Sequence, residues 1–274
     1  MTALISFEWL KLEKWWMPRA VVALISALTL GASCVLGANV VERGDLLLPR
    51  GWLAALSFSS IFAPFFWPLL GASWAGNEYG WGTIRSVLSR SPNRLEQALS
   101  AQAVLLAAVA LGILAVLVAG SIAGVLVAVF SGSALLTAGV WSATFLSTLL
   151  AGFVTAWFVS AFYLVVSYAA ATLARSAAVG VGVGLGATLA QYILRSILFG
   201  LGGHWRDIAG YFPIVYANSV ITRVVGPQLI PGTALATARA YEPSVGQSIE
   251  ALAIYGAICI AITLVAVRVR DVTA

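Results

Sequence analysis

The sequence predicts an all-α polytopic membrane protein of about six spanning helices, with both termini in the cytoplasm. Only 9% of the residues are charged, 61% are apolar, and the mean hydropathy is +0.98. The charges fall in short groups between long uncharged runs, the longest of which covers residues 97–174. This distribution excludes a soluble globular domain and a disordered chain. A β-barrel is also disfavoured, because barrel strands alternate apolar and polar residues over short segments.

The uncharged runs place the membrane spans in order, since a spanning helix needs roughly 20 apolar residues. The longest run would accommodate three spans, but we expect two, because its one strong turn signal is Ser131-Gly132-Ser133. The predicted spans lie at about 19–40, 52–74, 98–119, 141–173, 177–199 and 248–268.

Three segments outside the spans complete the layout of this single transmembrane domain. Residues of about 3–17 mix tryptophans with lysines and glutamates, which is typical of an elbow helix on the inner membrane surface. The same composition also suits a simple flank that orients the first span. A cytoplasmic loop is expected at 76–97. An outer segment at 200–247 is expected to form short helices against the membrane surface.

Orientation follows from the positive charges. Nine of the 15 Lys and Arg residues fall on the side that carries both termini in this layout, which favours that side as cytoplasmic. The net charge of +5 is explained by arginines beside anionic lipid headgroups, so the sequence predicts a lipid bilayer and no nucleic acid as a partner. Cys34 and Cys259 both fall inside predicted spans and are expected to be buried small residues.

The second predicted span combines prolines with aromatic rings. Pro64 and Pro68 each remove a backbone donor, so we expect a kinked helix that lines a protein cavity. Phe62 and Phe66 on the same helix, and Gln191 on the fifth span, complete the candidate translocation path. For each ring, packing against lipid is an equally good explanation.

The fifth predicted span carries Gly180, Gly182, Gly184 and Gly186, which form two interleaved GxxxG pairs. Small residues at this spacing allow two helix backbones to approach closely in a membrane. We therefore expect these glycines to serve helix packing. A dinucleotide-binding role is excluded, because no strand precedes them.

The chain lacks the motifs of self-contained chemistry. Its two lysines, Lys11 and Lys14, do not follow a phosphate-binding glycine loop, and no GxSxG elbow is present. One histidine and two scattered cysteines do not form a zinc cluster. We therefore predict no catalytic residue, no metal site and no cofactor in this chain. Energy for any uphill process is expected from another protein.

Residues 77–94 read NEYGWGTIRSVLSRSPNR and lie in the loop between the second and third spans. This sequence resembles the corresponding loop of ABC-2 type transporter permeases, where an acidic residue, a Gly-Thr pair and a Pro-Arg-like motif recur. The six-span layout, the elbow and the long outer segment are also similar to that family.

The resemblance implies the membrane subunit of an ABC exporter in the bacterial cytoplasmic membrane. Such a subunit pairs with a second permease chain, as a homodimer or a heterodimer, and with cytoplasmic ATP-binding subunits that hold ATP and Mg. Loop 76–97 would form the coupling helix that docks on the ATPase. In this loop Arg85, Arg90 and Arg94 would contact the ATPase, while Glu78 would cap or orient the loop. Helices two and five would line a path for a hydrophobic or amphipathic cargo.

Two other functions fit the sequence. A non-transporting membrane scaffold or assembly protein would show the same spans without an ATPase partner. An intramembrane hydrolase would need a serine facing His204, the only histidine, at one depth in the membrane.

Overall fold

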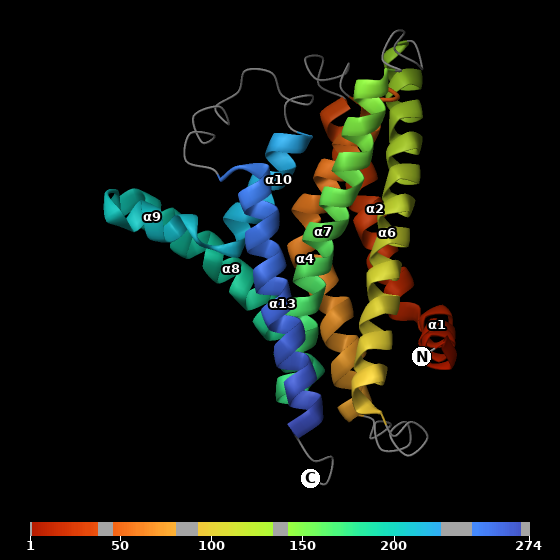
Figure 1. Cartoon of the computed structure of the whole chain (residues 1–274). Helices are drawn as coiled ribbons and strands as arrows, with labels where there is room; N and C mark the ends of the chain where they lie inside the picture. Colours follow the sequence, from red (N-terminus) through yellow and green to blue (C-terminus); the bar gives the residue numbers. More distant parts are fainter. Residues whose placement is uncertain (1, 38–45, 81–92, 134–141, 226–242, 270–274) are drawn as a thin grey trace.

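The computed structural model describes residues 2–37, 46–80, 93–133, 142–225 and 243–269. Within these ranges the chain is helical (Figure 1), and its helices are α1 (Thr2–Lys14), α2 (Trp16–Gly37), α4 (Gly51–Gly80), α6 (Arg94–Ser131), α7 (Ala143–Ala174), α8 (Ala177–Leu201), α9 (His204–Gly210), α10 (Pro213–Val224) and α13 (Val245–Val269). Six of them are long and apolar enough to cross a membrane: α2, α4, α6, α7, α8 and α13. The predicted fold class, an all-α multi-pass membrane protein, is confirmed.

The long uncharged run forms two helices, α6 and α7. The third span was predicted to end near residue 119, but α6 continues to Ser131, because nothing in the sequence stops it earlier. It ends at Gly132, whose φ of +64° is the left-handed conformation that glycine adopts without strain. At its other end the Asn93 side chain accepts a hydrogen bond from the backbone N–H of Glu96 and caps the helix.

A tight turn joins α7 to α8 at the first charge after the long run. Arg175 has a φ of +53° and ends α7, and the hydroxyl of Ser176 accepts a hydrogen bond from the N–H of Val179 to begin α8. The same end of the bundle carries the end of α4, because Gly76 lies against Ala177. Both chain termini are also found toward this end (Figure 1), as an even number of spans requires.

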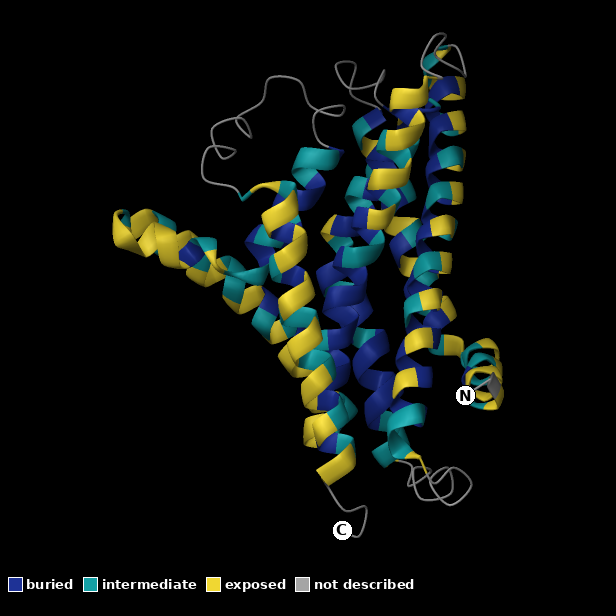
Figure 2. Ribbon diagram, viewed as in Figure 1, coloured by how far each residue is buried: buried dark blue, intermediate teal, exposed yellow. Residues whose placement is uncertain are grey.

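The centre of the bundle is α4. It packs against α2, α6, α7 and α8, and its Trp67 and Leu70 join Leu105, Ile113 and Leu164 in the main core. Figure 2 shows the buried residues concentrated on α4 and on the helix faces around it, whereas α8 and α13 expose most of their apolar residues. In a membrane these exposed faces lie where lipid chains are available.

Of the four glycines predicted to pack α8, one pair brings its backbone close to the neighbouring helices. A methyl group on Gly180 would lie 2.5 Å from Ala171 Cβ on α7, and one on Gly184 would lie 2.7 Å from Pro68 Cβ on α4. Gly182 and Gly186 have no atom within 4 Å of that position. The GxxxG packing predicted for all four glycines is therefore found at Gly180 and Gly184 within this chain.

Between α8 and α13 the described residues form two short helices, α9 and α10. The helix α10 packs against α13 and α7, so it belongs to the bundle. The helix α9 contacts α8 at the far end of that helix, away from the core (Figure 1).

Candidate functional site

The elbow segment forms α1, which lies beside α6 close to the end of α4 (Figure 1). Trp15 separates α1 from α2, and the guanidinium of Arg19 donates a hydrogen bond to the backbone carbonyl of Glu13 across this junction. Trp9 donates from its indole nitrogen to the Glu13 side chain at 2.9 Å. The Arg19 contact bridges α1 and the first span, whereas the Trp9 contact lies within α1.

The inner face of α1 carries a buried carboxylate. Glu8 is 1% exposed, and its Oε2 accepts a hydrogen bond from the indole nitrogen of Trp74 on α4 at 3.1 Å. The ammonium of Lys11 lies 3.7 Å from the same oxygen and also pairs with Glu78, near the end of α4. One lysine on α1 thus contacts two carboxylates, one from each helix.

Aromatic rings surround these charges. The Lys11 ammonium lies 4.3 Å from the centre of a Trp74 ring, and the rings of Trp15 and Trp74 are 5.3 Å apart. Cations bind well over an indole face, and more so where water is partly excluded. We call Glu8, Lys11, Trp15, Trp74 and Glu78 the elbow cluster.

The electrostatics of the elbow cluster are dominated by burial of Glu8. Burial raises the pKa of the Glu8 carboxyl above its ordinary value, Lys11 opposes this rise, and Glu78 adds to it. The second oxygen of Glu8, Oε1, has no hydrogen-bond partner within the described ranges of the chain. A buried charge with incomplete pairing is costly, so this carboxylate depends strongly on Lys11 and Trp74.

The arrangement joins α1 mechanically to the last turn of α4. Lys11 and Glu78 are 67 positions apart in sequence, and their contact spans the two helices. Glu78 stands two residues before the end of α4 at Gly80, so the first residues of the predicted coupling loop 76–97 belong to this helix. A displacement of the α4 end would therefore act on α1 through this ion pair.

Only part of the predicted coupling set falls in the structure. Glu78 lies on α4 in the elbow cluster, and Arg94 is the first residue of α6. Arg85 and Arg90 lie outside the described residues. Their contact with an ATPase stays a prediction, as does that of Arg94.

The residues predicted to line a translocation path are divided between two places. Phe62 and Phe66 meet edge to face on α4 with ring centres 6.4 Å apart, and Pro64 and Pro68 are buried on that helix, which is helical through both prolines. Gln191 on α8 instead lines a cavity whose walls come from α7, α8, α10 and α13. No α4 side chain lines this cavity.

Sequence reasoning missed the partners that complete these sites. Glu8 and Lys11 are three residues apart on α1 and share a helix face, but nothing in the sequence pairs them with Trp74. Tyr163, which lines the cavity with Gln191, stands in an uninterrupted apolar run and gives no periodic signal.

His204, needed by the hydrolase hypothesis, lies on α9 with its side chain 89% exposed. Its ion-pair partner is Asp207, at 3.8 Å on the same short helix. In the described segments no serine hydroxyl is bonded to it. The geometry gives no support to a serine–histidine pair.

In comparisons with known proteins, no protein-family model and no curated protein matches the chain.

Proposed function

We propose that this chain is the membrane-spanning permease subunit of an ATP-driven exporter of the ABC-2 type, in the bacterial cytoplasmic membrane. The observation that carries the proposal is the elbow cluster. It joins α1, a short helix outside the six spans, to the end of α4. The sequence at this end of α4 begins the segment 77–94 that resembles ABC-2 type permeases.

The proposed mechanism begins in a partner protein. Cytoplasmic ATP-binding subunits hold ATP and Mg and dock on loop 76–97, where Arg85, Arg90 and Arg94 supply positive charge. Closure of these subunits displaces the loop and, with it, the end of α4. Because Lys11 pairs with Glu78, the displacement is shared with α1.

Movement of α4 then reaches the rest of the bundle through close packing. Gly184 on α8 lies against Pro68 of α4, and Gly180 lies against Ala72, so α8 follows α4 as a body. A second permease chain, identical or different, would supply the other wall of the path. The apolar character of these helices favours a hydrophobic or amphipathic cargo.

The test is purification of the chain from its native membrane in a gentle detergent, with identification of the proteins that copurify. We expect a stoichiometric ATP-binding subunit and vanadate-sensitive ATP hydrolysis. A chain that purifies without any ATPase would instead support a membrane scaffold or assembly protein.

A sharper test uses the elbow cluster itself. Lys11→Met and Glu78→Gln should each reduce cargo-stimulated ATP hydrolysis, and the double variant should lose little more, because both remove the same contact. Lys14→Met is the matched control, since it removes a positive charge from the same helix at an exposed position. Additive losses, or an equal loss in the control, would contradict transmission through this pair.

A further inference from the structure

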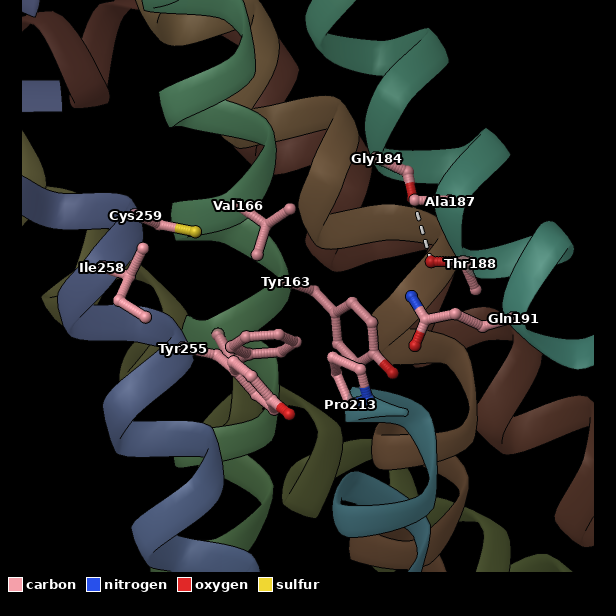
Figure 3. Close-up of a pocket in the computed structure, with 11 residues that line it drawn as sticks. Tyr163, Val166, Gly184, Ala187, Thr188, Gln191, Pro213, Tyr255, Ile258 and Cys259 are labelled. Atoms are coloured by element: carbon pink, nitrogen blue, oxygen red, sulfur yellow. Dashed lines mark hydrogen bonds between the residues drawn. The ribbon is translucent and has the colours of Figure 1, made fainter. Parts of the chain in front are cut away.

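A cavity of about 220 Å³ lies in the groove between α8 and α13. Both helices pack on α7 but barely on each other, so the α7 side chains Phe162 and Tyr163 form the floor. Pro213, at the start of α10, borders one side (Figure 3). Tyr163, Thr188 and Cys259 stand about 15–17 Å along their helices from the end near the chain termini, at ~1.5 Å per residue.

Most of the described residues that line the cavity are apolar, and one of the polar ones has an unpaired hydroxyl. Tyr163 is 3% exposed, and its hydroxyl has no hydrogen-bond partner among the residues the structure describes. In Figure 3 this hydroxyl points toward the side chain of Gln191 and toward Pro213. A buried hydroxyl without a partner is costly, which makes this atom the strongest sign of a missing ligand group.

The Gln191 amide is held in a fixed orientation beside that hydroxyl. Its Oε1 accepts a hydrogen bond from the backbone N–H of Ile214 at 3.1 Å. Its Nε2 has no partner in the described part of the chain and is free to donate. The hydroxyls of two other wall residues already have acceptors: Thr188 donates to the carbonyl of Gly184 at 2.9 Å, and Tyr255 donates to the carbonyl of Tyr211 at 3.0 Å.

The size and polarity of the cavity define what fits. By volume it would hold about seven waters at ~30 Å³ each, but each water needs two to four polar partners, and the walls offer two free groups. It is also smaller than the 300–1,000 Å³ typical of pockets for whole drug-sized ligands. An apolar chain with one acceptor oxygen fits both the volume of the cavity and its two free polar groups. The wall carries no charged residue, so the oxygen belongs to an uncharged group.

We propose that this groove binds an acyl chain of an uncharged lipid, whose ester carbonyl accepts hydrogen bonds from the Gln191 amide and the Tyr163 hydroxyl. The exposed apolar faces of α8 and α13 give such a chain a route from the bilayer. The Tyr163 hydroxyl is buried in the structure, so the proposal requires the Tyr163 or Gln191 side chain to rotate until this hydroxyl faces the cavity. The site goes beyond the proposed transport function, because its occupancy requires neither an ATPase nor turnover.

The test is photolabelling of the full chain in lipid nanodiscs. The probe is the methyl ester of a diazirine-bearing ten-carbon fatty acid, and the matched probe is a diazirine-bearing hydrocarbon of equal length. Labelled residues are mapped by peptide mass spectrometry. We expect the ester to label the α7 and α13 residues around Tyr163 and Cys259, and the hydrocarbon to label the exposed helix faces evenly.

Three variants separate hydrogen bonding from packing. Tyr163→Phe, which removes only the hydroxyl, should lower ester labelling in the groove roughly fivefold, as expected for one hydrogen bond, with hydrocarbon labelling unchanged. Gln191→Leu should act in the same direction. Thr188→Val is the control, since its hydroxyl is already bonded, and should label like the wild type. Unchanged ester labelling in Tyr163→Phe would overturn the proposal.

A second readout uses the protein's own cysteines. Cys259 lines the groove and Cys34 lies on α2, and the sequence has no others. With Cys34→Ser, methyl decanoate should slow labelling of Cys259 by a membrane-permeant maleimide. With Cys259→Ser, labelling of Cys34 should not change. Equal protection of both thiols would mean that the ester only partitions into the bilayer, and would also overturn the proposal.

Discussion

At the scale of single residues, Glu8 is a buried carboxylate whose hydrogen bonding is incomplete within the described residues. It is almost fully buried, one of its oxygens has no partner in the described structure, and its charge is balanced by a lysine that it shares with Glu78. Such a group is stable only while its neighbours stay in place. It therefore links the stability of the fold to the contact between α1 and α4.

Removing the shared cation should destabilise the protein. Lys11→Met leaves Glu8 buried without its ion pair, and we expect a loss of roughly 1–3 kcal/mol in the free energy of unfolding. Lys14→Met, on the exposed side of α1, should cost less than about 0.5 kcal/mol. Thermal unfolding of both variants in the same detergent measures the difference. Equal melting temperatures would show that the Lys11 contact contributes nothing.

The raised pKa of Glu8 predicts the direction of a pH effect. Between the ordinary value of 4.5 and the raised one, the folded protein binds the Glu8 proton more tightly than the unfolded chain does. Stability contributed by Glu8 is therefore greatest at low pH and falls as pH rises through this window. Melting temperatures measured upward from pH 4.5 should show this fall, and Glu8→Gln should reduce it. If the melting temperature of Glu8→Gln falls with pH as steeply as that of the wild type, groups other than Glu8 cause the pH dependence.

At the scale of helices, one face of α8 decides its position. Gly180 and Gly184 bring the backbone of α8 against α7 and α4, whereas Gly182 and Gly186 face open space. The same residue type, at the same spacing, therefore has a packing role on one face and no contact on the other.

This difference supplies a matched pair of substitutions. Gly184→Ala would place a methyl group 2.7 Å from Pro68 Cβ, so α8 must shift, and we expect a loss of about 1–3 kcal/mol. Gly186→Ala meets no atom and should be neutral or stabilise the helix by up to about 1 kcal/mol. Thermal unfolding again provides the measurement. A destabilised Gly186→Ala would indicate that this face packs against a second permease chain.

At the scale of the whole molecule, the bundle has a packed centre on α4 and two outer helices, α8 and α13, with little buried surface. In our proposals the packed centre transmits displacement from the end of α4, and the groove between the two outer helices binds an acyl chain. These two features are separable by experiment, since one depends on partners and the other on lipid alone.

The partner prediction concerns the basic loop. Arg85→Glu combined with Arg90→Glu should abolish copurification of the ATP-binding subunit, because two attractive charges become repulsive at the proposed contact. Arg195→Glu combined with Arg206→Glu, on α8 and α9 and distant in sequence from the loop, makes the same change in net charge and is the control. Intact assembly and transport in the double variant would show that the coupling assignment is wrong.

The fold class and the presence of six helices long enough to span a membrane follow from the sequence alone, because long uncharged runs have one stable arrangement in a bilayer. The sequence also singled out Gln191 and the glycines of the fifth span. Three contacts appear only in the folded molecule. Lys11 joins Glu8 to Glu78, and Gly180 and Gly184 are the pair of glycines that packs against other helices. Tyr163 stands beside Gln191 in the cavity wall. Hydropathy fixes which segments enter the membrane but not their rotation about their own axes. That rotation, which side-chain packing sets, selects the residues that meet.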